Sequence, residues 1–101
     1  MKKLYYEAFW HKNVNVNGHN ESDIIDTTGI ACFSKNKCIE QAKVEFKNLI
    51  NNKTEYNKMC NDNNATSIDI VVECFSVGDV NDINDMYGVQ GEWEDNVTTI
   101  K

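Results

Sequence analysis

Two histidines, four cysteines and a run of aspartates are the residues of this chain whose types suit chemistry. His11 and His19, the only histidines, flank the segment VNVNG. Two imidazoles that meet can share a metal ion. Asn17-Gly18, however, is the dipeptide that a two-residue type I′ hairpin favours, because both central residues of that turn need a positive φ. The first question is therefore whether the histidines meet or are separated by a turn.

A tight hairpin keeps the two imidazoles apart. It pairs Val16 with His19 and Trp10 with Ile25, and it leaves His11 about 17 Å from Val16 along the strand at ~3.3 Å per residue. The odd offset also turns the two rings to opposite faces. We therefore expect solvent-exposed histidines near the turn and no shared metal. A wide polar loop after the turn is the alternative in which the rings could meet.

The four cysteines are spaced too widely for a local metal knuckle. No Cys-x-x-Cys pair occurs among Cys32, Cys38, Cys60 and Cys74, and zinc sites commonly draw on such pairs. We expect reduced thiols that fill apolar space. Cys38 has the most lysines nearby, which is the setting that a reactive thiolate requires.

The run of aspartates and asparagines at residues 79–85 raises the question of calcium. An EF-hand loop starting at Asp79 needs an oxygen ligand at the fifth position, glycine at the sixth and glutamate at the twelfth. Ile83, Asn84 and Gln90 stand there instead. We interpret the run as a capped helical turn and keep a different type of calcium site as the alternative.

No familiar catalytic motif is present. The chain lacks a glycine-rich phosphate loop, a Gly-x-Ser-x-Gly elbow and a His-Glu-x-x-His helix, which mark phosphate binding, serine hydrolysis and zinc proteolysis. We expect no enzymatic activity and no cofactor. All ten basic residues are lysines. The planar arginine fork that reads phosphate and guanine is therefore missing, and we expect no direct contact with nucleic acid.

Charge is distributed unevenly along the chain. Residues 1–58 hold nine lysines and seven acids, whereas residues 59–100 hold nine acids and no base. Lysines cannot neutralise all of these carboxylates, so part of them must face water and repel one another. A negative surface attracts basic grooves and repels nucleic acid. We expect a protein partner with a basic surface, of the kind that binds nucleic acid. The alternative is that the acids serve solubility alone.

Seven residues are the candidate contacts with such a partner. Trp93 is flanked by acids in the segment EWED, which disfavours a buried ring, and an exposed tryptophan is a good interface anchor. Trp10, on the apolar face of the first strand, is expected in the core. The candidate contacts are Asp79, Asp82, Asp85, Glu92, Trp93, Glu94 and Asp95.

Hydrophobic periodicity predicts the elements that position these residues. Alternation over residues 4–16 predicts a long strand, and residues 24–33 predict a second strand interrupted by Gly29. Residues 68–77 are apolar on much of both faces, which favours a strand in the interior of a sheet. One or two short strands are expected in residues 89–101.

Residues 36–52 have a helical period instead. The apolar stripe consists of Ile39, Ala42, Phe46, Leu49 and Ile50. Ser34 or Asn36 can cap the start of this helix. It should stop or bend near Asn51–Asn52, with a short continuation through Tyr56 and Met59. A second, short helix is predicted over residues 78–88, with Gly88 as its terminator.

The order of elements, β-β-α-β-(short α)-β, predicts an α+β fold. It is an antiparallel sheet of about four strands with one main amphipathic helix packed on one face. Its length of 101 residues fits a single domain, residues 1–101. Glu7 interrupts any signal-peptide core and no apolar run reaches membrane-spanning length. We therefore expect a cytoplasmic protein that does not contact membranes.

Small, acidic, single-domain chains without catalytic signatures are similar in composition and size to inhibitors that phages and mobile elements encode, including anti-CRISPR and anti-restriction proteins. The resemblance rests on no motif, so it assigns a role to no residue. It implies a non-enzymatic protein-interaction module that mimics nucleic acid and occupies a basic groove of its target. The alternative is a small metal-binding domain that uses the cysteines, the histidines or the run Asp79–Asp85.

Overall fold

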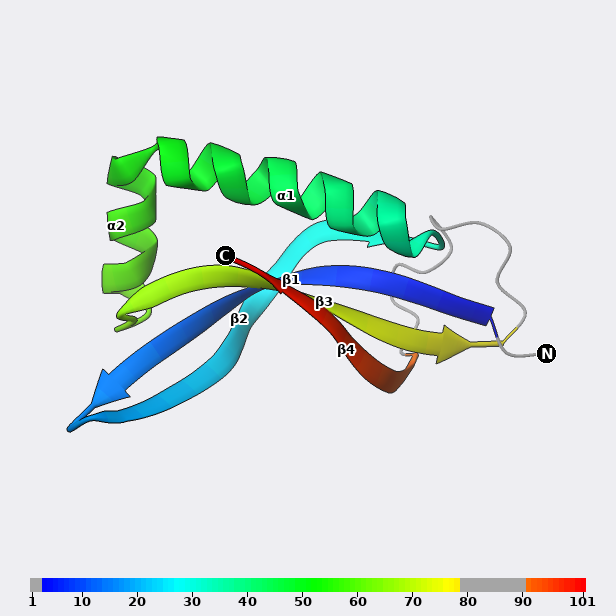
Figure 1. Ribbon diagram of the computed structural model, residues 1–101, viewed down its shortest axis with the longest axis horizontal. Helices are drawn as coiled ribbons and strands as arrows, with labels where there is room; N and C mark the ends of the chain where they lie inside the picture. Colours follow the sequence, from blue (N-terminus) through cyan, green and yellow to red (C-terminus); the bar gives the residue numbers. More distant parts are fainter. Residues whose placement is uncertain (1–2, 79–90) are drawn as a thin grey trace.

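The computed structural model describes residues 3–78 and 91–101. These residues form a four-stranded antiparallel sheet with two helices on one of its faces (Figure 1). The strands are β1 (Lys3–Val16), β2 (His19–Cys32), β3 (Ser67–Val77) and β4 (Glu92–Ile100), and the helices are α1 (Lys35–Asn51) and α2 (Lys53–Asp62). The predicted α+β class is confirmed. The short helix predicted over residues 78–88 lies, from residue 79 on, outside the described residues.

The strands lie in the order β2-β1-β3-β4. β3 therefore lies between β1 and β4, as the apolar character of both its faces predicted. β4 is a single strand that pairs with β3 from Ile70–Ile100 to Ser76–Glu92. The long connection through the helices carries the chain from one edge of the sheet, β2, to its interior.

The predicted two-residue hairpin joins β1 to β2. Asn17 and Gly18 have φ values of 53° and 78°, as a type I′ turn requires. Val16 pairs with His19 directly beyond the turn. The sequence pattern of this segment was therefore sufficient to place both the turn and its first pair.

Farther from the turn, β-bulges change the register. The predicted pair of Trp10 with Ile25 is wrong, because Trp10 opposes Asp26. The register shifts between Trp10 and His11, where β2 has one extra residue. A second shift lies near Gly29, whose φ of 84° is one that glycine adopts without strain. Alternation within one strand cannot reveal such insertions.

The ends of α1 follow the predicted signals. The Ser34 hydroxyl accepts a hydrogen bond from the Lys37 N–H at 3.3 Å, so Ser34 is the N-cap. The helix ends at Asn51, and the Asn52 side chain accepts from the Glu55 N–H at 3.3 Å. Asn52 thus starts the separate helix α2. α2 is the continuation that the sequence predicted. It is joined to β3 by a hydrogen bond from the Ile68 N–H to the Tyr56 hydroxyl at 3.2 Å.

The main core lies between α1 and the sheet. Its buried side chains are Ala8, Cys32, Cys38, Ala42, Phe46, Ile70, Val72 and Ile100. Trp10 packs against this cluster, as expected. Ile50 departs from the prediction, because 44% of its surface is exposed. Leu49 takes the inward position in the last turn of α1, and the next residue, about 100° farther around the helix, lies at the margin of the core. Neither helix, among the described residues, combines the length and apolar character that crossing a bilayer requires.

Ile70 tests the importance of this core. Its side chain is fully buried, so Ile70→Ala should lower the free energy of unfolding by about 2–5 kcal/mol, because it removes apolar contacts and leaves a cavity. Urea denaturation followed by circular dichroism measures the change. Val44→Ala is the matched control, since Val44 is 61% exposed on α1, and it should change stability by less than about 0.5 kcal/mol. Equal losses in both variants would contradict the assignment of the core.

Candidate functional site

The face of the sheet turned away from the helices carries the aromatic and polar side chains that the core does not use. Ala8, Ile70 and Val72 face α1, so their odd-numbered neighbours on β1 and β3 face the other way. We call this the distal face. Its side chains are Tyr5, Phe9, His11 and Asn13 on β1, Asp69, Val71, Glu73 and Phe75 on β3, and Trp93 opposite Phe75 on β4.

An aromatic cluster occupies one end of the distal face. The rings of Tyr5 and Phe75 stack with centroids 5.2 Å apart, and Phe9 meets Phe75 edge-on at 6.1 Å. Gly91 packs so closely on Tyr5 that an added Cβ would lie 2.9 Å from the ring. Any larger residue at that position would displace the ring. The cluster fixes the start of β4 and with it the position of Trp93.

A polar cluster lies farther along the same face. His11 Nδ1 is 2.6 Å from Asp69 Oδ1, and the Asn13 amide donates to Asp69 Oδ2 at 2.9 Å. An ionised carboxylate only accepts, so Nδ1 carries a hydrogen and donates it to Asp69. The Asn13 amide also donates to the Ser67 hydroxyl at 3.2 Å. Asp69 is thereby satisfied although only 4% of its surface is exposed.

The first half of β4 is exposed along its whole length. Glu92, Trp93, Glu94, Asp95 and Asn96 are five consecutive exposed residues, and β4 lies at the edge of the described sheet. We call these five residues the β4 acidic edge. Its tryptophan is 60% exposed, and the indole N–H donates to the carboxylate of Glu73 at 2.9 Å. Trp93 is thus oriented by β3 while most of its ring contacts water.

Glu92 and Asp95 of the β4 acidic edge lie on the other side of the strand from Trp93. Trp93 opposes Phe75 on the distal face, whereas Glu92 opposes Ser76 and Asp95 opposes Cys74. Burial, above all, raises the pKa of the Cys74 thiol, and the charges of Glu94 and Asp95 raise it further. Both carboxylates therefore lie near that thiol, toward the helix side of the sheet.

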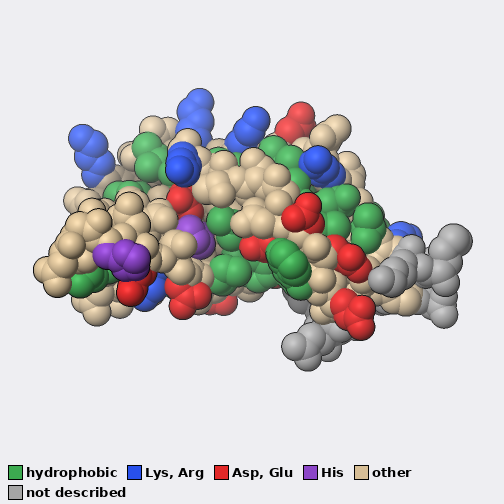
Figure 2. All heavy atoms as spheres, turned by 60° about the horizontal axis from the view of Figure 1, so that its bottom comes forward, with side chains coloured by type: hydrophobic (Ala, Val, Ile, Leu, Met, Phe, Trp, Pro, Cys, Tyr) green, Lys and Arg blue, Asp and Glu red, His purple; other side chains and the backbone are tan. Residues whose placement is uncertain are grey.

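Opposite charges gather in different layers of the molecule. The two helices hold six lysines and four acids, whereas the four strands hold nine acids and two lysines. Figure 2 shows lysine side chains mainly along the helix side and carboxylates mainly around the strands. Within the described residues, His11 and Asp69 form a pair that approaches within ion-pair distance. Glu92 and Asp95 have no lysine within ion-pair distance among the described residues.

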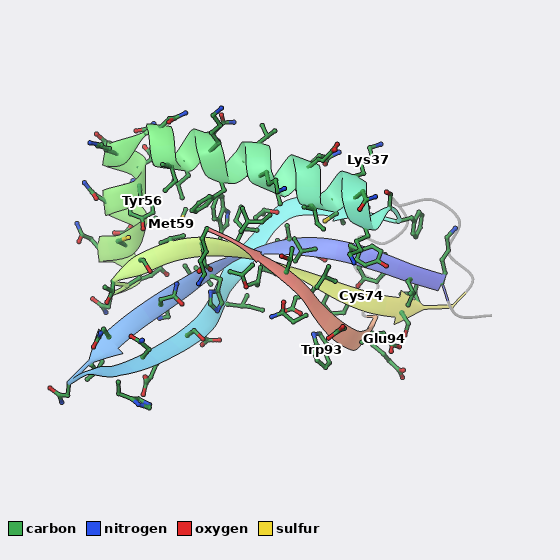
Figure 3. All side chains as sticks on the ribbon, in the orientation of Figure 1. Lys37, Tyr56, Met59, Cys74, Trp93 and Glu94 are labelled. Carbon is green, nitrogen blue, oxygen red and sulfur yellow. The ribbon has the colours of Figure 1, made fainter. Side chains whose placement is uncertain are left out.

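The predicted contact residues are brought together only in part. Glu92, Trp93, Glu94 and Asp95 adjoin on β4, and Figure 3 shows Trp93 and Glu94 at the same end of the strand. Asp79, Asp82 and Asp85 lie outside the described residues. Sequence reasoning missed Glu73, which orients Trp93. Alternation over residues 68–77 was the available signal, because it places Glu73 on one face with Asp69 and Phe75.

The histidines do not meet. His19 is exposed at the hairpin, as predicted, and His11 lies on the distal face. The expectation that His11 is solvent-exposed is wrong, since 16% of its side-chain surface is accessible. The reason is its pairing with Asp69, which is 58 residues away in sequence. No group of three metal-binding side chains occurs in residues 3–78 and 91–101.

The cysteines are mainly buried thiols. Cys32, Cys38 and Cys74 are buried and Cys60 is half-buried. Burial, with smaller contributions from Cys32 and Glu7, raises the pKa of Cys38 to about 12. A reactive thiolate needs a shift in the opposite direction. The lysines near Cys38 in sequence therefore do not activate it, since they point to solvent while the thiol points inward.

Comparisons with known proteins add no family to this description. Searches against protein-family models, curated proteins and solved structures gave no significant match.

Asp69 should stabilise the distal face. Asp69→Ala removes the acceptor of both His11 and Asn13, so we expect the free energy of unfolding to fall by about 1–3 kcal/mol. Chemical denaturation measures the loss. Glu21→Ala, at an exposed position of β2, is the control and should change stability by less than about 0.5 kcal/mol. A neutral Asp69→Ala would show that the cluster does not stabilise the fold.

Alkylation should distinguish the thiols. A thiol with a pKa of about 12 is a thiolate in roughly one molecule in ten thousand at pH 8, and Cys38 is also shielded from reagents. Iodoacetamide should therefore modify Cys60 while leaving Cys38 intact in the native protein. Peptide mass spectrometry identifies the modified residue. In concentrated urea the two should react alike, and rapid native modification of Cys38 would contradict its burial.

Proposed function

We propose that this protein is a non-enzymatic protein-interaction module whose β4 acidic edge binds a basic surface on a protein partner. The observation that carries the proposal is the run of five exposed residues on an edge strand, in which three carboxylates adjoin in sequence a tryptophan that is 60% exposed. Tryptophan is enriched among the residues that contribute most to binding at protein interfaces, and covering its exposed ring would remove apolar surface from water.

The charge spacing of this edge supports imitation of nucleic acid. A strand advances about 3.3 Å per residue, so the carboxylates of Glu92, Glu94 and Asp95 span on the order of 10 Å. Phosphates on one DNA strand advance about 3.4 Å each along the axis. The three negative charges are therefore about 5 Å apart on average, which is a sparser row than the phosphates of one DNA strand but of the same order of spacing. The class of partner that follows is a nucleic-acid-handling protein, with inhibition by occupation of its basic groove, as in anti-CRISPR or anti-restriction proteins.

Trp93 can supply binding affinity that a pattern of charges alone does not provide. Ion pairs at the rim of an interface contribute mainly to association rate and orientation, whereas buried tryptophans often contribute 2 kcal/mol or more to affinity. The hydrogen bond to Glu73 restricts the indole before binding. The entropy lost on binding is thereby reduced.

The separation of lysines on the helices from acids on the strands favours the approach of a basic partner from the strand side. Lysines of the helices and acids of the strands give the surface two poles, so a basic groove is attracted by the strands and repelled by the helices. No observation in the described part of the chain favours the metal-binding alternative, since three ligands are nowhere grouped there.

Neutralising the β4 acidic edge should weaken partner binding. We expect E92Q/D95N to reduce affinity by about tenfold or more near 0.05 M salt, because each lost charge removes attraction to a basic groove. Raising salt to about 0.5 M should weaken the wild type toward the level of the variant, since screening shortens the range of its charges. Pull-downs from host lysate with quantitative mass spectrometry identify the partner, and titration with the purified partner measures affinity.

The matched control is E40Q/E45Q on α1. It changes the net charge by the same amount but alters exposed acids of the helix layer, so it should leave binding intact. Trp93→Ala should weaken binding by about thirtyfold, as expected of an interface hot spot. Binding that is independent of salt, or equal losses in E92Q/D95N and E40Q/E45Q, would refute the β4 acidic edge as the contact. Nucleic acid that fails to compete for the partner would refute the mimicry.

A further inference from the structure

A groove lies between α1 and the C-terminal half of β4, away from the β4 acidic edge. Its volume is about 560 Å³, within the range typical of small-molecule sites. It is lined by Ile39, Lys43, Phe46, Lys47 and Ile50 of α1 and by the last residues of the chain, including Ile100. The C-terminal end of β4 lies beneath α1 (Figure 1), where Ile100 joins the main core.

The floor of this groove is apolar. Phe46 and Ile100 belong to the main core and form its base. Ile39 is half-buried, and Ile50 exposes 44% of its surface. An exposed isoleucine that adjoins core side chains extends the apolar surface of the core out to solvent. A ligand that covers Ile50 would remove this surface from water, which is favourable in proportion to the apolar area covered.

Lysines flank this apolar surface. Lys43 and Lys47 are four residues apart on α1, and both line the groove. Like charges at this spacing repel each other and destabilise a helix slightly. In the described residues no carboxylate lies within ion-pair distance of either ammonium group. An anion held between the two lysines would relieve that repulsion, although the chain as a whole has a net charge of −6.

We propose that this groove binds a small amphipathic anion, a single acyl chain that ends in a carboxylate. The chain lies on Phe46 and Ile100 and covers Ile50, and the carboxylate lies between Lys43 and Lys47. The combination of an apolar lining with a few convergent polar groups is characteristic of small-molecule sites. A free ligand fits a concave site of this volume better than a membrane, which presents a broad surface. The inference does not depend on the proposed function, since it uses lysines rather than acids.

Decanoate and decyltrimethylammonium, both kept below their micelle concentrations, test the proposal. They have chains of equal length and head groups of opposite charge, and amide NMR spectra of the full-length protein report where each binds. Decanoate should shift the amides of α1 near Lys43 and Lys47 and those of Thr98–Ile100. A protein with net charge −6 attracts cations without any specific site, so preference for the anion identifies the groove. Stronger binding of the cation, or shifts elsewhere, would overturn the proposal.

Two matched pairs of variants separate the head-group and chain contacts. K43Q/K47Q should weaken decanoate binding at least tenfold, whereas K37Q/K58Q, with the same charge change outside the groove, should not; Lys37 lies on the outer side of α1 (Figure 3). Ile50→Ser should likewise weaken binding, and Val44→Ser, at another exposed apolar position of α1, should not. Equal effects within either pair would refute the site. An acidic, leucine-containing peptide that binds this groove when decanoate does not would refute it in favour of a protein-docking groove.

Discussion

β3 is buried on both of its faces, and this constraint sets the position of the other strands and of α1. Ile70 and Val72 face the helix, while Val71 and Glu73 face the other way, and all four are nearly or fully buried. A strand of this kind must have a neighbour on each edge and a covering layer. β1 and β4 supply the neighbours and α1 supplies the layer. A charge on the distal side of such a strand must find a hydrogen-bond donor, because leaving it unpaired would be costly.

Asp69 and Glu73, the two acids of β3, find their hydrogen-bond donors in different ways. Asp69 is paired with His11 and Asn13 within the sheet, which forms a closed polar cluster. Glu73 accepts the indole N–H of Trp93, which orients a ring that remains exposed. Because each buried carboxylate requires a hydrogen-bond donor, Asp69 stabilises the sheet and Glu73 orients Trp93, a candidate interface residue.

The separation of charge between layers follows from the same architecture. The helices use one face for the core and expose the rest, and lysine, with its long side chain, is abundant there. The edge strands β2 and β4 have both faces partly exposed and carry six of the nine acids of the strands. The two poles suit ligands of opposite charge, a basic protein surface at the β4 acidic edge and a small anion beside Lys43 and Lys47.

Local signals determined the hairpin at Asn17-Gly18, the cap at Ser34 and the interior character of residues 68–77, because each depends on neighbours within a few positions. Charge counting also located the acidic half of the chain, of which residues 59–78 and 91–100 are described. Strand order, the bulge that pairs Trp10 with Asp26, and the contact between His11 and Asp69 were decided only by tertiary structure. Those contacts join residues far apart in sequence, and a one-residue shift in register changes which side chains meet. No period within a single segment contains that information.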